Sequence, residues 1–220
     1  MTGLRRRSAT ALVYGAVVVA AILAPAPVFG LLLLVALVLG ARELIALRGA
    51  GAAVVIEGAL LVVGLVSLLV LRSAGASLNA HGWDAAAPAW LLLAVLPTWA
   101  ADVAAYAAGS VFGRRKIAPR ISPGKTWEGS IAGVGVAAIA AFGVGAFFGL
   151  PRASVALVVV AIGPAALAGD LFESYLKRRV GAKDSGALLP GHGGVLDRID
   201  SLIAVAPLVT VALYLASGLG

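Results

Sequence analysis

The sequence contains no cysteine among its 220 residues, and it has few charged residues for its length. The lack of cysteine excludes disulfide bonds, so cysteine usage does not indicate the redox compartment. It also excludes thiolate ligands, which makes zinc a poor candidate metal. Charged residues make up 12% of the chain, far fewer than in an ordinary soluble domain. Hydrophobic residues make up 61%, which is typical of a helical membrane protein.

Long apolar runs predict an all-α fold, a polytopic membrane bundle of about seven transmembrane helices that forms a single domain over 1–220. Within it, 1–98 contains the N-terminal spans, 99–201 the region expected to carry the function, and 202–220 the last span. The predicted spans are 9–24, 27–47, 52–71, 88–108, 129–150, 153–172 and 202–218.

Basic residues predict how these spans are oriented. With the N-terminus in the cytoplasm, seven crossings place every Lys and Arg except Arg72 and Arg152 on the cytoplasmic side of the cell membrane. The two charged windows, defined as residues 102–128 and 170–200, then both face the cytoplasm. The net charge of +7 is explained by this topology together with an anionic partner, lipid or nucleotide, and nucleic acid is not expected.

The second charged window predicts two acidic helix faces. If the sixth span continues beyond the membrane, four of its side chains share one face: Asp170, Glu173, Ser174 and Lys177. A helix beginning near Val195 would carry Asp197 and Asp200 in the same way. Such carboxylates suit Mg²⁺, which binds oxygen ligands, but a solvated network of ion pairs with nearby arginines is also open.

Two turns rich in glycine accompany these faces. Residues 122–126, Ser-Pro-Gly-Lys-Thr, resemble the end of a P-loop, but Pro119 stands where that motif requires glycine and no strand is expected before it. The run can still bind phosphate through its hydroxyl, ammonium and N–H groups. Residues 190–194, Pro-Gly-His-Gly-Gly, lead into a helix and favour either an anion site or a tight turn.

Polar and small residues inside the predicted spans give two further expectations. Asp102 and Glu57 lie within spans, where an ionisable group is costly and is a functional candidate, and a basic residue of 114–125 is the expected partner of Asp102. Gly129 and Gly133 are four residues apart, which favours close packing of helices within the chain, while a homodimer stays open.

The run from Ser174 to Asp200 resembles the signature of phosphatidate cytidylyltransferases, the CDP-diacylglycerol synthases. It reads SYLKR, then KDSG after four residues, then LPGHGGVLDRID after two more. Gly-Asp-Leu-Phe-Glu at 169–173 and Ser-Pro-Gly-Lys-Thr-Trp-Glu-Gly at 122–129, with Tyr106 and Gly113 upstream, resemble the same family. The resemblance covers about residues 102–200, and one or two N-terminal spans are expected to be missing.

This resemblance implies transfer of the cytidylyl group of CTP to phosphatidate, giving CDP-diacylglycerol and pyrophosphate for phospholipid biosynthesis. It implies Mg²⁺ as the cofactor, with the number of cations open, and CTP, phosphatidate and membrane lipids as partners. The implied catalytic residues are Asp170, Lys177, Asp197 and Arg198. The implied metal ligands are Asp170, Glu173, Asp197 and Asp200. The implied substrate-binding residues are Ser122, Lys125, Thr126, Arg178, Lys183, Asp184, His192, Gly193 and Gly194.

Two other functions stay open on the sequence alone. A CTP-dependent lipid kinase of the polyprenol or phytol type would share the membrane setting and the nucleotide but would transfer the γ-phosphoryl group. A membrane protein without enzymatic activity would use its basic loops only to bind anionic lipid. Product analysis separates the two enzymes, because one makes a CDP-lipid and pyrophosphate and the other makes a lipid phosphate and CDP.

Overall fold

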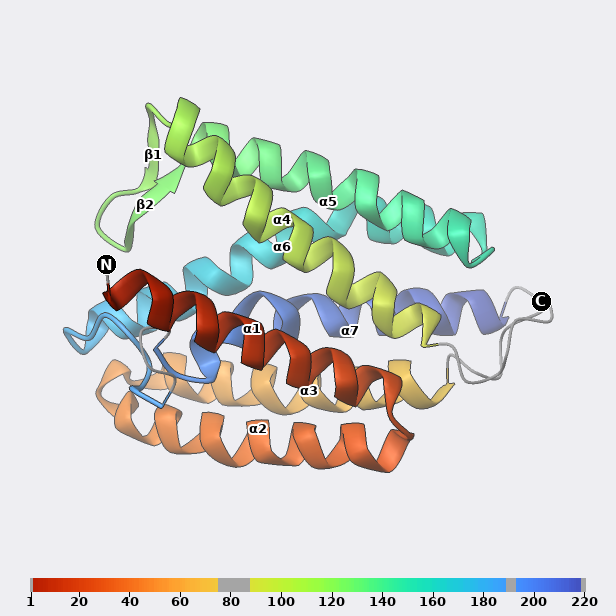
Figure 1. Ribbon diagram of the computed structural model, residues 1–220, viewed down its shortest axis with the longest axis horizontal. Helices are drawn as coiled ribbons and strands as arrows, with labels where there is room; N and C mark the ends of the chain where they lie inside the picture. The colour runs from red at the N-terminus through yellow and green to blue at the C-terminus, as the bar shows by residue number, and fades with distance from the viewer. Residues whose placement is uncertain (1, 75–87, 189–192, 219–220) are drawn as a thin grey trace.

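The computed structural model describes residues 2–74, 88–188 and 193–218, which form a helical bundle (Figure 1). Its α-helices in the described part of the chain are α1 (Thr2–Leu23), α2 (Ala26–Ala46), α3 (Ala52–Ala74), α4 (Ala89–Phe112), α5 (Trp127–Phe147), α6 (Arg152–Arg179) and α7 (Leu196–Gly218). A short 3₁₀ turn, Arg48–Ala50, follows α2. The all-helical class predicted from the sequence is confirmed.

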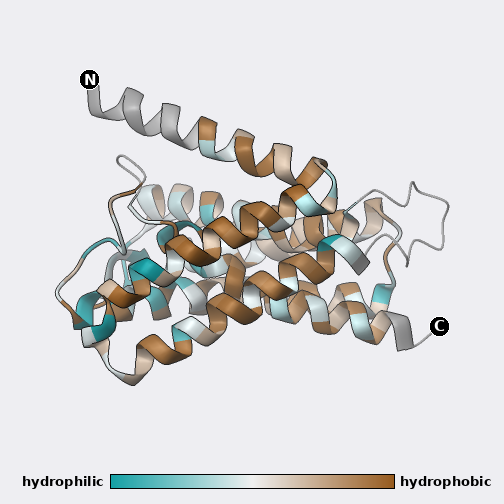
Figure 2. Ribbon diagram, turned by 90° about the horizontal axis from the view of Figure 1, so that it is seen from below, coloured by the Kyte–Doolittle hydropathy of each residue, from teal (hydrophilic) through white to brown (hydrophobic). Residues whose placement is uncertain are grey.

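Six of these helices, α2 to α7, are long and apolar enough to cross a membrane. Their outward-facing side chains are apolar, as Val103 and Ile139 illustrate with 70% and 73% exposure, and such side chains suit contact with lipid. Figure 2 shows hydrophobic residues along the middle of the bundle. In α1, the part whose side chains are described contains a shorter apolar stretch, Val13–Leu23. The seven predicted spans therefore correspond to six long helices and α1.

The helices are arranged in layers (Figure 1). α4 and α5 pack against each other on one side, α2 and α3 pack together on the opposite side, and α6 and α7 run between the two pairs. α1 packs against α2 and crosses the front of the bundle in this view. The core includes Trp90, Leu91 and Leu93 of α4 and Val209 of α7, each at most 1% exposed.

Glycines allow the closest helix contacts. A Cβ atom on Gly129 would lie 2.6 Å from the carbonyl oxygen of Ala105, and one on Gly133 would lie 2.9 Å from that of Ala101, so α5 needs both glycines to meet α4. This confirms the predicted packing within the chain. Gly169 has the same role between α6 and α7, because its Cβ would lie 2.5 Å from the Asp200 carbonyl oxygen. The acidic part of α6 is thereby held against the start of α7.

Charged helix ends extend beyond the predicted spans. α6 continues to Arg179 and α7 begins at Leu196, whereas the spans were predicted to end at 172 and to begin at 202. The difference arises because hydropathy marks only the apolar part of a helix, while backbone hydrogen bonding continues into its charged turns. The continuous α6 confirms that Asp170 and Lys177 lie on one helix, and α7 begins beside Val195 as expected.

The described part of the chain contains a β-hairpin in addition to its helices. Strands β1 (Lys116–Ala118) and β2 (Ser122–Thr126) are antiparallel, with Lys116 opposite Thr126. Residues 122–126, which were predicted as a turn with no strand before it, therefore form strand β2, and strand β1 precedes them. The Glu128 carboxylate accepts the Arg114 N–H at 3.1 Å, and the Thr126 hydroxyl oxygen accepts the Gly129 N–H at 3.2 Å as the N-cap of α5. These bonds fix the hairpin on the ends of α4 and α5.

Candidate active site

The two charged windows meet in one cavity of about 680 Å³. α4, the hairpin, α5, α6 and α7 all contribute to its lining, and the volume falls in the range typical of small-molecule sites. Its lining includes these predicted site residues: Ser122, Lys125, Thr126, Asp170, Lys177, Asp184, Asp197, Arg198 and Asp200. Asp102 and Tyr106 of α4 line the same cavity. Residues up to about 100 positions apart in the sequence are thus brought together.

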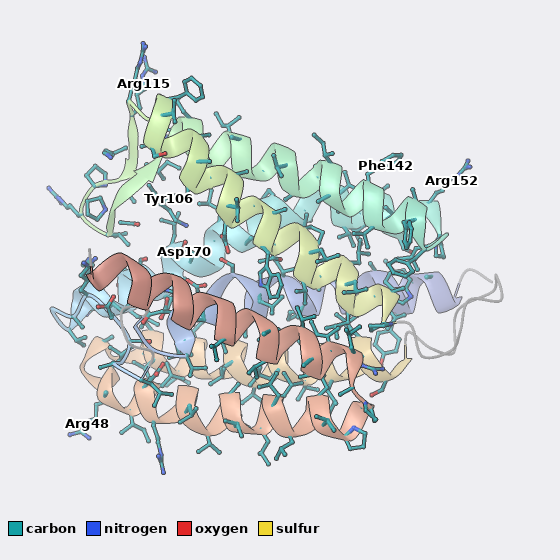
Figure 3. The ribbon with its side chains drawn as sticks, viewed as in Figure 1. Arg48, Tyr106, Arg115, Phe142, Arg152 and Asp170 are labelled. Atoms are coloured by element: carbon teal, nitrogen blue, oxygen red, sulfur yellow. The ribbon has the colours of Figure 1, made fainter. Side chains whose placement is uncertain are left out.

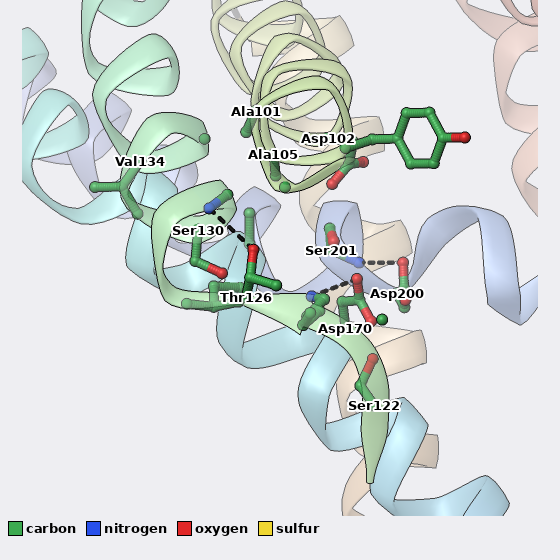
Figure 4. A pocket seen from close by; sticks show the side chains of 18 of the residues that line it. Ala101, Asp102, Ala105, Ser122, Thr126, Ser130, Val134, Asp170, Asp200 and Ser201 are labelled. Carbon is green, nitrogen blue, oxygen red and sulfur yellow. Dashed lines mark hydrogen bonds and ion pairs between the residues drawn. The ribbon is translucent and has the colours of Figure 1, made fainter. Parts of the chain in front are cut away.

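An ion pair joins the two windows. Lys125 Nζ of β2 lies 2.5 Å from Asp170 Oδ2 of α6, and their side chains are 22% and 29% exposed (Figure 4). The Ser174 hydroxyl donates to Asp170 Oδ1 at 3.3 Å. Lys125, one of the basic residues of 114–125 that were expected to include a partner for Asp102, thus forms its ion pair with Asp170, because β2 places it over α6. The hairpin is held across the cavity by this contact.

Lys177 forms a second, more deeply buried cluster. Its Nζ donates to Glu173 Oε2 at 2.9 Å, one turn earlier in α6, and to Asp197 Oδ1 at 2.5 Å in α7. The side chains are 10%, 0% and 6% exposed for Lys177, Glu173 and Asp197, respectively. A buried carboxylate requires a cation nearby, because unpaired buried charge is strongly destabilising. Lys177 supplies one positive charge, which the two carboxylates share, and links α6 to α7.

Asp197 also fastens the chain segment between these helices. Its Oδ2 accepts the Ser185 N–H at 2.9 Å, the Ser185 hydroxyl at 2.9 Å and the Gly194 N–H at 2.7 Å. Together with Lys177, four donors therefore surround this one carboxylate. Both carboxylate oxygens of Asp197, a predicted metal ligand, are therefore already hydrogen-bonded to groups of the protein.

The predicted metal ligands do not gather around one point. Among the described residues, no three Asp, Glu or His side chains are arranged to hold a metal ion. Glu173 is fully buried against Lys177, and Asp197 is engaged as described above. Asp170 and Asp200 line the cavity, as Asp197 does, and Asp200 Oδ1 accepts the Ser201 N–H at 2.7 Å (Figure 4). Mg²⁺ is commonly bound by one or two carboxylates together with oxygen atoms of the substrate phosphates. Asp170 and Asp200 could supply these carboxylates.

The remaining predicted residues differ in position. Arg178 and Lys183 are exposed and lie outside the cavity lining in the described part of the chain. Arg178 instead donates to the carbonyl oxygens of Ile121, at 3.0 Å, and Ala182, at 2.7 Å, and so ties the hairpin to the segment after α6. The Gly194 N–H is directed at Asp197 rather than into the cavity, Gly193 adjoins it, and His192 lies outside the described residues.

Glu43 is a buried residue of α2 that sequence reasoning did not select. Its carboxylate accepts the N–H groups of Val195 and Leu196, both at 2.9 Å, and the Ser185 hydroxyl at 3.0 Å. The available signal was its position within the predicted span 27–47, since an acidic residue inside a span is a functional candidate. No motif surrounds it, so its partners were not predictable.

Known proteins with related sequences identify the family of this chain. Residues 52–216 match the model of the cytidylyltransferase family, and the chain belongs to that family. A phosphatidate cytidylyltransferase of Haemophilus influenzae is 46% identical over 131 residues, covering 53% of this chain and 43% of that protein. A phosphatidate cytidylyltransferase of Pseudomonas aeruginosa is 46% identical over 136 residues, covering 59% and 49%.

An uncharacterized protein of Escherichia coli, YnbB, is similar as well. It is 49% identical over 107 residues, which cover 48% of this chain and 36% of YnbB. The chain spans about half the length, or less, of the curated relatives it matches. Family membership therefore establishes the class of protein, while the identity of the substrates needs a separate argument.

Proposed function

We propose that this member of the cytidylyltransferase family transfers the cytidylyl group of CTP to phosphatidate, giving CDP-diacylglycerol and pyrophosphate. The observation that carries the proposal is the meeting of two charged windows in one cavity, joined by the pair of Lys125 and Asp170. A site for two anionic substrates needs positive charge from more than one direction, and β2, α6 and α7 supply it. The similarity to two phosphatidate cytidylyltransferases supports the choice of substrates.

The reaction requires positioning and charge neutralisation more than covalent catalysis. A phosphate oxygen of phosphatidate attacks the α-phosphorus of CTP, a new P–O bond forms, and the bond from the α-phosphorus to the bridging oxygen breaks as pyrophosphate leaves. The attacking phosphate is already ionised at neutral pH, so no side chain has to remove a proton. Lys125 and Arg198 line the cavity and lower the repulsion between the two substrates, while Lys177, also in the lining, is paired with Glu173 and Asp197.

Mg²⁺ fits this site through Asp170 and Asp200, two of the predicted metal ligands that line the cavity, whereas Asp197, which also lines it, is engaged by Lys177, Ser185 and Gly194. When bound, the ion would neutralise charge on the triphosphate and the departing pyrophosphate. Lys125 already neutralises Asp170 in the structure, so this lysine is placed to exchange its carboxylate partner for a substrate phosphate. Lys177 holds Asp197 in position during the reaction.

The location of the cavity suits a lipid substrate. Asp170 and Tyr106 lie toward the end of the bundle that carries Arg115 and Arg48, whereas Arg152 lies at the other end (Figure 3). Lipid headgroups would lie at one end of spans of this length. Tyr106 lines the cavity and is 80% exposed, so the cavity is bordered by a surface that lipid can reach. A phosphatidate headgroup would enter from the membrane while CTP enters from the aqueous side.

Product analysis tests the proposed reaction. Purified protein is incubated with phosphatidate, Mg²⁺ and CTP labelled at the α-phosphate, and we expect the label to enter the lipid and pyrophosphate to be released. Chelation of the divalent cation should stop the reaction. Transfer of a γ-phosphate label to a polyprenol, with release of CDP, would replace this proposal with the lipid kinase, and no transfer to either lipid would favour a non-enzymatic protein.

Cysteine labelling tests the proposed topology, because the natural chain contains no thiol. Ser185 is only 5% exposed and is a poor reporter, whereas Ala187 and Arg152 are exposed. In whole cells, a membrane-impermeant thiol reagent should label the Arg152→Cys variant and should not label Ala187→Cys until the membrane is opened. The reverse pattern would place the cavity on the outer side of the membrane and contradict the proposed cytoplasmic site.

A further inference from the structure

We infer that Glu43 is a positioning residue, whose carboxylate fixes the start of α7 and the segment 182–188 so that Asp197 meets Lys177. Glu43 lies in α2, before the residues that match the family model, and it is 9% exposed. It does not line the cavity in the described part of the chain, so it acts through other residues. Its effect on turnover rests on the proposed function, whereas its effect on the structure does not.

Three donors converge on the Glu43 carboxylate. Oε1 accepts the Val195 N–H at 2.9 Å, and Oε2 accepts the Leu196 N–H at 2.9 Å and the Ser185 hydroxyl at 3.0 Å. The Ser185 oxygen also lies 2.9 Å from Asp197 Oδ2. One hydroxyl therefore bridges a carboxylate of α2 and a carboxylate of α7, and it donates its single proton to one of them at a time.

The first turn of α7 needs such an acceptor. The first N–H groups of a helix have no partner within the helix, and Leu196 is fully buried, so water does not satisfy them. A carboxylate at this end is also attracted by the helix dipole. Glu43 thus holds the end of the helix that carries Asp197, Arg198 and Asp200, from a helix about 150 residues away in the sequence.

Two glycines make this contact sterically feasible. A Cβ atom on Gly186 would lie 2.7 Å from Glu43 Oε1, and a Cβ on Gly194 would contact Glu43 Oε2 and the Ser185 hydroxyl. Gly194 belongs to residues 190–194, for which the sequence favours an anion site or a tight turn, and Gly186 ends the KDSG part of the family signature. In the structure, their backbones surround the Glu43 carboxylate closely. Their small size serves the positioning of α7.

Amide hydrogen exchange tests the contact directly. In the full-length Glu43→Gln variant, one acceptor oxygen is replaced by a donor group, so exchange in a peptide covering Val195 and Leu196 should become about tenfold faster or more. The matched control is Arg42→Gln, which removes a charge from the neighbouring exposed position of α2 and should leave this exchange unchanged. Unchanged exchange in Glu43→Gln would overturn the inference, whether or not the protein is an enzyme.

Kinetics test whether the contact positions the site. Glu43→Gln should lower kcat about tenfold with a smaller change in KM for CTP, because substrate groups are retained while Asp197 is misplaced. Ser185→Ala should act in the same direction, the double variant should lose less than the product of the two effects, and Ser185→Thr should restore activity by keeping the hydroxyl. Faster exchange with normal kcat would show a purely structural contact and overturn the positioning role.

The contact of Glu43 can be tested even if one variant does not fold or the protein lacks the proposed activity. If Glu43→Gln does not fold, Ser185→Ala removes only the hydroxyl bridge, and an unchanged exchange and kcat in that variant would contradict the inference. If the unmodified protein transfers no cytidylyl group, the proposed function fails by itself, and the exchange measurement still decides whether Glu43 holds α7.

Discussion

Asp197→Asn is expected to lower cytidylyl transfer at least about a hundredfold, since loss of one preorganised polar contact in an active site has effects of this size. Asp197 accepts hydrogen bonds from Lys177 and from the N–H groups of Ser185 and Gly194, and it shares the Ser185 hydroxyl proton with Glu43. Asparagine offers one acceptor oxygen and directs an amide group toward donors. Breaking a buried ion pair from one side costs about 3 to 5 kcal/mol, so Lys177 would no longer be held between α6 and α7.

The measurement is turnover across a magnesium titration, with size-exclusion elution and thermal unfolding to establish that the variant folds. The hydrophobic core contains Ile203, Val209 and Leu213 of α7 and not Asp197, so the bundle should stay intact. Glu128→Gln is a suitable comparison for stability, because Glu128 also accepts backbone N–H groups but fastens the hairpin instead of α7. Near-normal turnover at any magnesium concentration would show that Asp197 is not an active-site residue.

Lys125→Ala should lower kcat/KM for CTP by about one to two orders of magnitude. The reason is that a charge-assisted hydrogen bond in a partly buried site contributes roughly 1.5 to 3 kcal/mol. The substitution removes the ammonium group that lies 2.5 Å from Asp170 and that is placed to exchange this carboxylate for a substrate phosphate. Lys125→Arg keeps the charge and should lose less activity than alanine. Steady-state kinetics with CTP varied at saturating phosphatidate would measure both effects.

The control for Lys125 has to lie in the same hairpin but outside the cavity. Lys116 lines the cavity, so it is unsuitable, whereas Arg120 is exposed and lies outside the lining among the described residues. Arg120→Ala should change kcat/KM little. If both alanine variants have small and equal effects, the hairpin serves only as a membrane anchor and the active site comprises residues 170–200 alone.

Local sequence patterns were sufficient for several features of this protein. The apolar runs predicted the helical membrane bundle, because a span must satisfy its backbone within the helix whatever its neighbours are. The helical period placed Asp170 and Lys177 on one face of α6, because that relation depends only on the rise and turn of a single helix. The run from Ser174 to Asp200 indicated the family, and residues 52–216 match it.

The hairpin was not predicted, because its formation depends on pairing between two short segments. Residues 122–126 contain proline and glycine, which favour a turn, yet Thr126 pairs with Lys116 and caps α5. The carboxylate of Glu128 and the ends of α4 and α5 stabilise that pairing from outside the two strands. Strand propensity is weak compared with such contacts.

The membrane class, the family and the side chains that share a face of one helix therefore follow from the sequence. The tertiary structure alone decided the partners: Lys125 with Asp170, Lys177 with Asp197, and Glu43 with the start of α7. These pairs join residues 20 to about 150 positions apart, and each depends on how two or more helices pack. The physical reason is that periodicity specifies the direction of a side chain on its own helix, whereas its partner is specified by close contacts such as that of Gly169 with α7.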